Sequence, residues 1–209
     1  MKKLLEHYKK NRVLIKNRLM DFEDSYKKDD KHVFSELCFC LLTPQAEAVE
    51  CDKAIKNLRE TGLLFNGAPE EISPYLKAAR FLNKKAEYIA GARQLFKKNG
   101  RFRIKNFIDK KDIFKTREWI VKNVKGIGYK EASHFLRNIG FGKDLAILDV
   151  HILKNLKYYG IINKIPESLT KNEYLEIESK LRNFCKKINI HMDELDLLFW
   201  SRETGFIFK

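Results

Sequence analysis

The sequence has few cysteines, and their positions do not form a metal-binding pattern. No two of them have the Cys-x-x-Cys spacing of zinc sites and iron–sulfur clusters, and no histidine cluster lies near them. We therefore expect no metal ion and no other cofactor. Without an export signal, reduced thiols in a cytoplasmic protein are the expectation. The four cysteines are Cys38, Cys40, Cys51 and Cys185.

A long apolar run is also lacking. Charged residues interrupt the N-terminal segment 1–22 every few positions, so this segment has neither the core of a signal peptide nor the length of a membrane span. We expect no association with a membrane. Its apolar residues share one helical face instead, which predicts an amphipathic helix docked on the protein. They are Leu4, Tyr8, Ile15, Leu19 and Phe22.

Glycine and proline are scarce, with 10 and 4 residues, and no stretch alternates convincingly over the length of a strand. Apolar residues recur at spacings of three and four, as in Val33, Leu37 and Leu41. This pattern predicts an all-α protein of about ten short helices. Two helical lobes would suit the length, although the pattern alone shows no boundary.

Acidic residues are too few to balance the basic ones. Lys and Arg number 42 against 28 Asp and Glu, which gives a formal net charge of +14. Because 44% of the residues are hydrophobic, the chain should nevertheless fold. A basic excess of this size favours a polyanionic partner such as DNA. The alternative is a folded protein that is merely basic.

The segment KGIG, residues 125–128, separates two predicted helices. The first follows Asp112 as its N-cap, and the second begins near Tyr129. Glycines permit a positive φ and a close approach to another molecule, and the first N–H groups of the second helix offer an anion site. A helix–hairpin–helix that grips phosphate is one interpretation, and an ordinary turn between two helices is the other.

Lys130 lies in the first turn of the second helix, where the macrodipole disfavours a positive charge. The same field and partial burial are expected to lower the pKa of the amine, which would make it a nucleophile. The alternative is a lysine that pairs with a phosphate or a neighbouring carboxylate.

Asp149 interrupts the apolar run LAILDVHIL, residues 145–153. It is predicted to cap the helix that follows and to stay ionised. Most such aspartates are only caps, but one placed at a cleft also presents an anion to a developing cation.

The segment GIGYK (126–130) followed by LDVH (148–151) resembles the helix–hairpin–helix DNA glycosylases of the endonuclease III superfamily. The ending, MDELDLLFW (192–200) and TGFIFK (204–209), is similar to the archaeal-type, or type 2, 8-oxoguanine DNA glycosylases. The likeness covers nearly the whole chain. The C-terminal four-cysteine motif of endonuclease III itself is missing from this sequence.

The resemblance implies a two-lobed helix–hairpin–helix glycosylase fold with a central cleft. One lobe would span residues 31–143 and contain the hairpin at about 112–140, and the other would join residues 1–30 to 144–209. It also implies a monomeric enzyme, both DNA N-glycosylase and abasic-site lyase, acting on double-stranded DNA that contains 8-oxoguanine.

In that family the lysine of the hairpin is the nucleophile, which assigns this role to Lys130. It would attack C1′ of the damaged nucleotide, release the base through a Schiff base, and nick the strand by β-elimination. The resemblance gives Asp149 the stabilisation of the cationic sugar. The hairpin residues Lys125, Gly126 and Gly128 would hold the DNA backbone.

Further roles follow from the resemblance for residues that surround an extruded base. Gln45 in LLTPQ (41–45) would fill the gap in the DNA, although a polar residue that merely starts a helix is equally compatible. Phe81 and Trp200 would sandwich the base, but aromatic residues at helical spacing more often belong to a core. Lys209, the last residue, would read the oxidised guanine.

Two other functions fit parts of the pattern. A glycosylase/lyase of the same superfamily for oxidised pyrimidines would share the hairpin and its lysine. A non-catalytic helix–hairpin–helix module would keep the glycines but has no need for Lys130 and Asp149 at a separation of nineteen positions.

Overall fold

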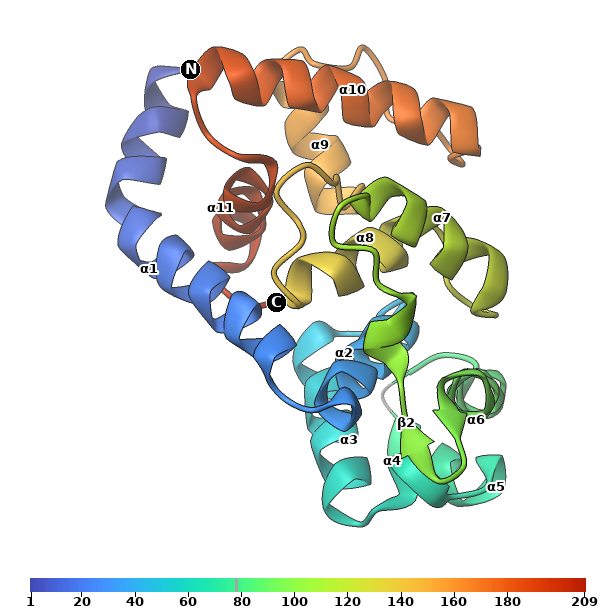
Figure 1. Ribbon diagram of the computed structural model, residues 1–209. Coiled ribbons are helices and arrows are strands. Elements are labelled where there is room, and N and C mark those ends of the chain that lie inside the picture. The colour runs from blue at the N-terminus through green and yellow to red at the C-terminus, as the bar shows by residue number, and fades with distance from the viewer. Residues whose placement is uncertain (78) are drawn as a thin grey trace. The chain divides into compact units, whose positions relative to one another are not determined.

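The computed structural model describes residues 1–77 and 79–209, and the fold is almost entirely helical (Figure 1). The prediction of an all-α protein is therefore confirmed. The helices are α1 (Lys2–Lys27), α2 (Asp30–Leu42), α3 (Ala48–Glu60), α4 (Leu63–Asn66), α5 (Pro69–Ile72), η1 (Ser73–Leu76), α6 (Leu82–Phe96), η2 (Ile104–Phe107), α7 (Ile113–Asn123), α8 (Tyr129–Asn138), α9 (Val150–Tyr158), α10 (Lys171–Ile188) and α11 (Met192–Thr204).

A small β-hairpin departs from the prediction. Strands β1 (Lys97–Lys98) and β2 (Arg101–Phe102) pair antiparallel, with Lys97 opposite Phe102. The turn residues Asn99 and Gly100 have φ values of 50° and 75°, as the Asn-Gly turn of a tight hairpin requires. Strands of two residues are too short to show alternation in the sequence, so only the turn was visible there.

The chain divides into two compact units, residues 25–135 and residues 1–24 together with 136–209. Both divisions fall inside a helix, one in α1 and one in α8. The prediction from the sequence places them after residues 30 and 143.

Helix α2 forms the core of the unit 25–135. Every residue from Val33 to Leu42 is buried, and the helix packs against α3, α6 and η2. The ring of Phe34 contacts Phe96 of α6 and Phe102 of β2 at centroid distances of 6.5 and 4.8 Å. A mostly apolar helix that is buried on all sides needs neighbours around it, and the other elements of this unit enclose α2.

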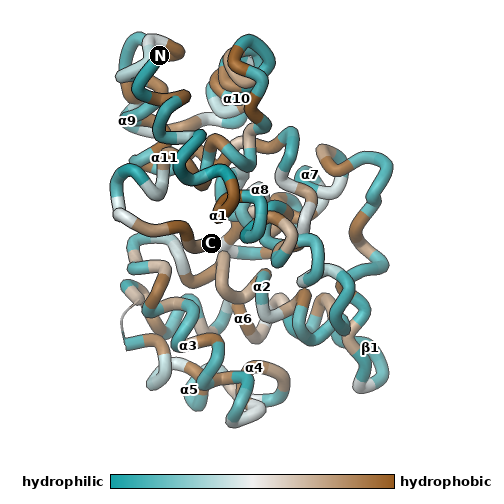
Figure 2. Tube along the Cα trace, turned by 90° about the vertical axis from the view of Figure 1, so that its left-hand side faces the viewer, coloured by the Kyte–Doolittle hydropathy of each residue, from teal (hydrophilic) through white to brown (hydrophobic). Residues whose placement is uncertain are grey.

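Helix α11 has the corresponding place in the unit formed by residues 1–24 and 136–209. It packs against α9 and α10, and its residues Leu195, Leu198 and Phe199 are almost fully buried. Helix α1 is amphipathic and docked, as predicted, because Leu4, Ile15 and Phe22 are buried. The Tyr8 hydroxyl donates a hydrogen bond to Glu194 of α11. Figure 2 shows the alternation of hydrophilic and hydrophobic residues along the helices.

All four cysteines are free and buried, in agreement with the expectation of reduced thiols. Burial raises the pKa of Cys51 to about 11 and that of Cys185 to about 12. Among the residues that the structure describes, no helix combines the length and the apolar character needed to cross a membrane.

A buried charged pair joins Arg137 of α8 to Asp196 of α11. The Arg137 guanidinium lies 3.4 Å from the Asp196 carboxylate, and the two side chains are 4% and 10% exposed. The guanidinium also lies over the Phe22 ring, 4.8 Å from its centroid. Burial raises the pKa of Asp196 to about 7, although Arg137 opposes this rise, and the nearby charges of Asp149 and Asp193 add to it.

The raised pKa of Asp196 predicts a pH-dependent stability. Because the folded-state value of about 7 lies above an unfolded value of roughly 4, the native protein binds a proton that the unfolded chain releases. The free energy of unfolding therefore falls as the pH rises from about 4 to about 7 and is constant above that range. Thermal unfolding of Asp196→Asn should show a melting temperature that rises relative to the unsubstituted protein between pH 5 and pH 8, by several degrees. A constant difference across this range would contradict the assignment.

Candidate active site

Helices α7 and α8 form the predicted helix–hairpin–helix. The Asp112 carboxylate caps α7 by accepting a hydrogen bond from the Lys115 N–H at 2.9 Å, as predicted. Between the helices, the buried Arg117 of α7 donates to the Ser133 hydroxyl of α8 at 3.1 Å. Its guanidinium lies over the Tyr129 ring at 5.3 Å. These contacts fix the two helices as a pair around the turn 124–128.

Gly126 is required by the packing of this turn. Its φ is +89°, and a Cβ atom added there would lie 2.2 Å from Cδ2 of Tyr88. Any side chain would therefore collide with the tyrosine ring as well as force a left-handed conformation on an L-residue. Gly128 does not have a positive φ, so only the first of the two glycines uses the conformational freedom that the sequence suggested.

Glu131 is a residue of the site that the sequence reasoning missed. Its carboxylate accepts a hydrogen bond from the Gly128 N–H at 3.2 Å and lies 3.0 Å from the Lys130 ammonium. Gly128 is thus the N-cap of α8 and Glu131 its third residue, which is the reciprocal half of a capping box. The signal was present as Gly-x-x-Glu across residues 128–131.

Lys130 lies in the first turn of α8, as predicted, and its side chain is 29% exposed. Its ion pair with Glu131 corresponds to the alternative in which the lysine pairs with a neighbouring carboxylate. The Gly128 amide is occupied by the same carboxylate. The neighbouring Lys125 is exposed at the turn.

Three predicted residues from separate segments of the unit 25–135 meet at one cavity. Gln45, Phe81 and Gly126 line a space of about 210 Å³, together with Leu41, Pro44, Lys84, Lys85 and Tyr88. Gln45 and Phe81 both have a left-handed backbone, with φ values of 55° and 58°. Phe81 is 67% exposed, so it is not a core residue of this unit. Residues other than glycine and asparagine rarely have a left-handed backbone. Where they do, they often belong to functional sites.

The other predicted residues belong to the unit formed by 1–24 and 136–209. Asp149 caps α9 by accepting a hydrogen bond from the Ile152 N–H at 2.7 Å, which confirms the predicted cap. Its side chain is half-buried, and its charge contributes to the raised pKa of Asp196. The carboxylate is thus held in place by the start of a helix.

Trp200 of α11 carries the C-terminal tail. Its ring contacts Phe206 and Phe208 at centroid distances of 5.1 and 6.2 Å. The tail is therefore docked by its apolar residues, and Lys209 is half-buried at its end.

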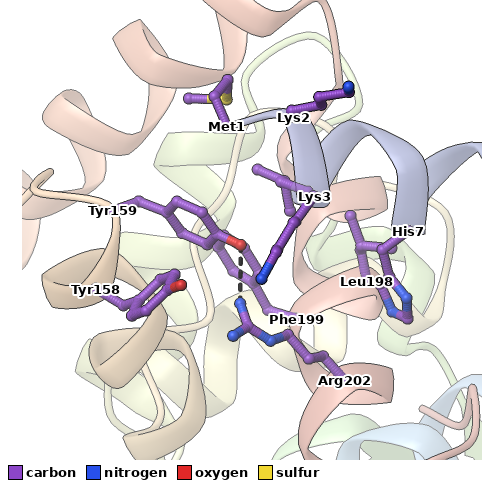
Figure 3. A pocket seen from close by; sticks show the side chains of 10 residues that line it. Met1, Lys2, Lys3, His7, Tyr158, Tyr159, Leu198, Phe199 and Arg202 are labelled. Atoms are coloured by element: carbon purple, nitrogen blue, oxygen red, sulfur yellow. Dashed lines mark hydrogen bonds between the residues drawn. The ribbon is translucent and has the colours of Figure 1, made fainter.

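A larger cavity of about 650 Å³ lies in the same unit and contains none of the predicted residues (Figure 3). The Arg202 guanidinium donates to the Tyr159 hydroxyl at 2.8 Å and lies 4.9 Å from the centroid of the Tyr158 ring. Both tyrosines are at the C-terminal end of α9, whereas Asp149 caps its N-terminal end. Size alone therefore does not identify the candidate active site.

The close approach of Gly126 to Tyr88 can be tested by substitution. Gly126→Ala should lower the free energy of unfolding by roughly 2–4 kcal/mol, because the backbone strain and the collision add. Gly100→Ala is the matched control, since its φ of +75° is also left-handed but its added Cβ atom meets open space. Chemical denaturation should show the smaller loss for Gly100→Ala and partial recovery in Gly126→Ala/Tyr88→Ala. Equal losses in the two glycine variants would refute the close contact.

Comparison with known proteins gives one consistent family. A family model described as 8-oxoguanine DNA glycosylase matches residues 15–190. The 8-oxoguanine DNA glycosylase/AP lyase of Fusobacterium nucleatum is 45% identical over 204 residues, which cover 97% of this chain and 94% of the relative. The 8-oxoguanine DNA glycosylase/AP lyase of Methanocaldococcus jannaschii is 40% identical over 212 residues, which cover 99% of this chain and 98% of the relative.

Solved structures agree with the sequence relatives. The crystal structure of the M. jannaschii 8-oxoguanine glycosylase/lyase in complex with 15mer DNA containing 8-oxoguanine has a TM-score of 0.89 and 37% identity, covering 99% of this chain and 98% of that one. The 8-oxoguanine DNA glycosylase of Thermotoga maritima has a TM-score of 0.89 and 34% identity, covering 100% and 97%. The resemblance inferred from the sequence is confirmed. The chain belongs to the 8-oxoguanine DNA glycosylase family.

Proposed function

We propose that this protein excises 8-oxoguanine from double-stranded DNA and then nicks the strand at the abasic site. The observation that carries the proposal is the position of Lys130. It stands in the first turn of α8, directly after the glycine hairpin, with its ammonium held 3.0 Å from the Glu131 carboxylate. A primary amine fixed beside a phosphate-binding turn is suited to attack a sugar in the DNA backbone.

In the proposed reaction the Lys130 ammonium first loses a proton to solvent, and the neutral amine forms a bond to C1′ as the bond from C1′ to the base breaks. The base leaves with the bonding electrons and takes up the proton that the newly formed C1′ ammonium releases. The C1′–O4′ bond of the sugar then breaks, O4′ takes up a proton from solvent, and the nitrogen lone pair forms a protonated Schiff base, which acidifies the hydrogens on C2′. Loss of one of them expels the 3′ phosphate by β-elimination, and water releases the lysine. A covalent intermediate of this kind divides a difficult substitution into easier steps.

Asp149 is proposed to stabilise the positive charge that develops on the sugar. Its carboxylate is oriented by its hydrogen bond to the Ile152 N–H, so it need not reorganise during the reaction. A fixed anion near a developing cation lowers the barrier, and such electrostatic terms are commonly the largest in catalysis.

We propose that the remaining predicted residues bind DNA and the extruded base. The hairpin residues Lys125, Gly126 and Gly128 would contact the backbone, Gly128 through the close approach that a missing side chain allows, because its N–H is bound to Glu131. Gln45 would fill the gap in the stack. The exposed ring of Phe81, together with Trp200 and Lys209, would contact the base. Extrusion costs a few kcal/mol of stacking, so these contacts would offset it. The monomeric state and the cytoplasmic location stay predictions from the sequence.

Lys130→Gln should abolish excision of 8-oxoguanine from a duplex with cytosine opposite the lesion, by at least about 10³-fold, because the nucleophile is lost. DNA binding should be retained. Single-turnover strand cleavage and a fluorescence binding assay measure the two quantities. Lys122→Gln is the matched control, since Lys122 is an exposed lysine in the last turn of α7. Equal excision by Lys130→Gln and the unsubstituted protein would refute the assignment. If the unsubstituted protein excised only oxidised pyrimidines, the alternative of a pyrimidine glycosylase/lyase of the same superfamily would be favoured.

Shortening the chain by its last residue should weaken the discrimination between 8-oxoguanine and guanine by about tenfold, the size of one lost hydrogen bond. Excision rates on duplexes that carry either base give the ratio. Lys209 could contact the base through its side chain or through the terminal carboxylate. Lys209→Ala separates these two contacts, because it removes the side chain but leaves the carboxylate at position 209. Unchanged selectivity in both variants would remove Lys209 from the site.

A further inference from the structure

Lys85 is a buried cation on α6. It is 5% exposed, and its ammonium donates hydrogen bonds to the carbonyl oxygens of Leu42 and Pro44, both at 2.6 Å. Burial lowers the pKa of Lys85; Cys51 opposes this fall, Lys130 adds to it and Glu131 opposes it. Burying a lysine ammonium costs free energy unless hydrogen bonds or an opposite charge compensate it. The two carbonyl oxygens supply this compensation, and the position of the ammonium therefore depends on them.

The two bonds hold the turn that follows α2. Leu42 is the last residue of α2, and its carbonyl is one of those that the helix cannot satisfy itself. The Pro44 carbonyl belongs to the peptide bond that leads into Gln45. A cation bound to both oxygens therefore fixes the orientation of that peptide and also complements the negative end of the helix.

Lys85 also lines the 210 Å³ cavity that Gln45 and Phe81 share. Phe81 is the N-cap of α6, and its carbonyl accepts the first backbone hydrogen bond of the helix, from the Lys85 N–H at 3.0 Å. That bond does not depend on the Lys85 side chain, whereas the two bonds to the turn before Gln45 do. Left-handed conformations at Gln45 and Phe81 are strained and persist only where surrounding contacts enforce them.

We propose that Lys85 is a positioning residue whose side chain presents Gln45 in the conformation needed to extrude and replace a base. The inference rests on the proposed function. Lys85 does not touch the reacting atoms in this account. It orders a turn before DNA arrives, so that binding energy is not spent on ordering it.

The test is Lys85→Met, which keeps the length of the side chain and removes its donors. Two reactions are compared. Single-turnover excision from an 8-oxoguanine duplex requires extrusion, whereas borohydride trapping of a single-stranded abasic oligonucleotide requires only the Lys130 amine. Because the Lys85 charge also acts on the Lys130 amine, both reactions are measured over a range of pH and compared at their maxima. We expect the maximal duplex rate to fall about tenfold or more while maximal trapping changes by less than about twofold.

Arg93→Met is the matched control. Arg93 lies on the same helix, and its guanidinium donates to the Gly67 carbonyl of another loop at 2.7 Å. Its loss should lower thermal stability as Lys85→Met does, but should leave the ratio of the two reactions unchanged. A second control is Gln45→Ala. If Lys85 acts through Gln45, Lys85→Met should reduce duplex excision by less than about twofold in that background.

Each result decides the matter. Equal losses in both reactions, or full additivity with Gln45→Ala, would overturn the inference. Should Lys85→Met fail to fold, Lys85→Gln, which is too short to reach both carbonyls, is measured in the same way with the same two outcomes. An unsubstituted protein that neither excises 8-oxoguanine nor forms a trapped adduct would refute the proposed function instead.

Discussion

The Glu131 carboxylate is the contact on which the hairpin depends. It satisfies the Gly128 N–H at the start of α8 and holds the Lys130 ammonium at the same time. The first requirement fixes the helix start, and the second fixes the amine relative to that start. A single buried acid thereby ties the turn between the two helices and the Lys130 amine to the start of α8. The Arg117–Ser133 bond and the close fit of Gly126 against Tyr88 complete this support.

The sequence predicted features whose causes are local. Asp112 and Asp149 were expected to cap helices, and both do so, because a cap requires only its own residue and the next turn. The capping bond of Glu131 is equally local. It was within reach of sequence reasoning, since Gly128 and Glu131 have the spacing of a capping box.

Features that depend on distant contacts could not be predicted. The hydrogen bonds of Lys85 reach Leu42 and Pro44, which precede it in the sequence by 43 and 41 positions. These bonds therefore exist only after α2 and α6 have packed. The left-handed backbone of Gln45 and Phe81 has no compositional signal, because neither residue favours it. The family resemblance named both residues, but only the structure shows that they share a cavity.

The most direct measurement maps the covalent bond itself. The unsubstituted protein is reduced with borohydride while it acts on an 8-oxoguanine duplex, digested with a protease, and the peptide that carries the DNA is sequenced by mass spectrometry. The account predicts a single modified peptide with the adduct on the side chain of Lys130. An adduct on another lysine, on the N-terminal amine, or on no residue would contradict the central claim.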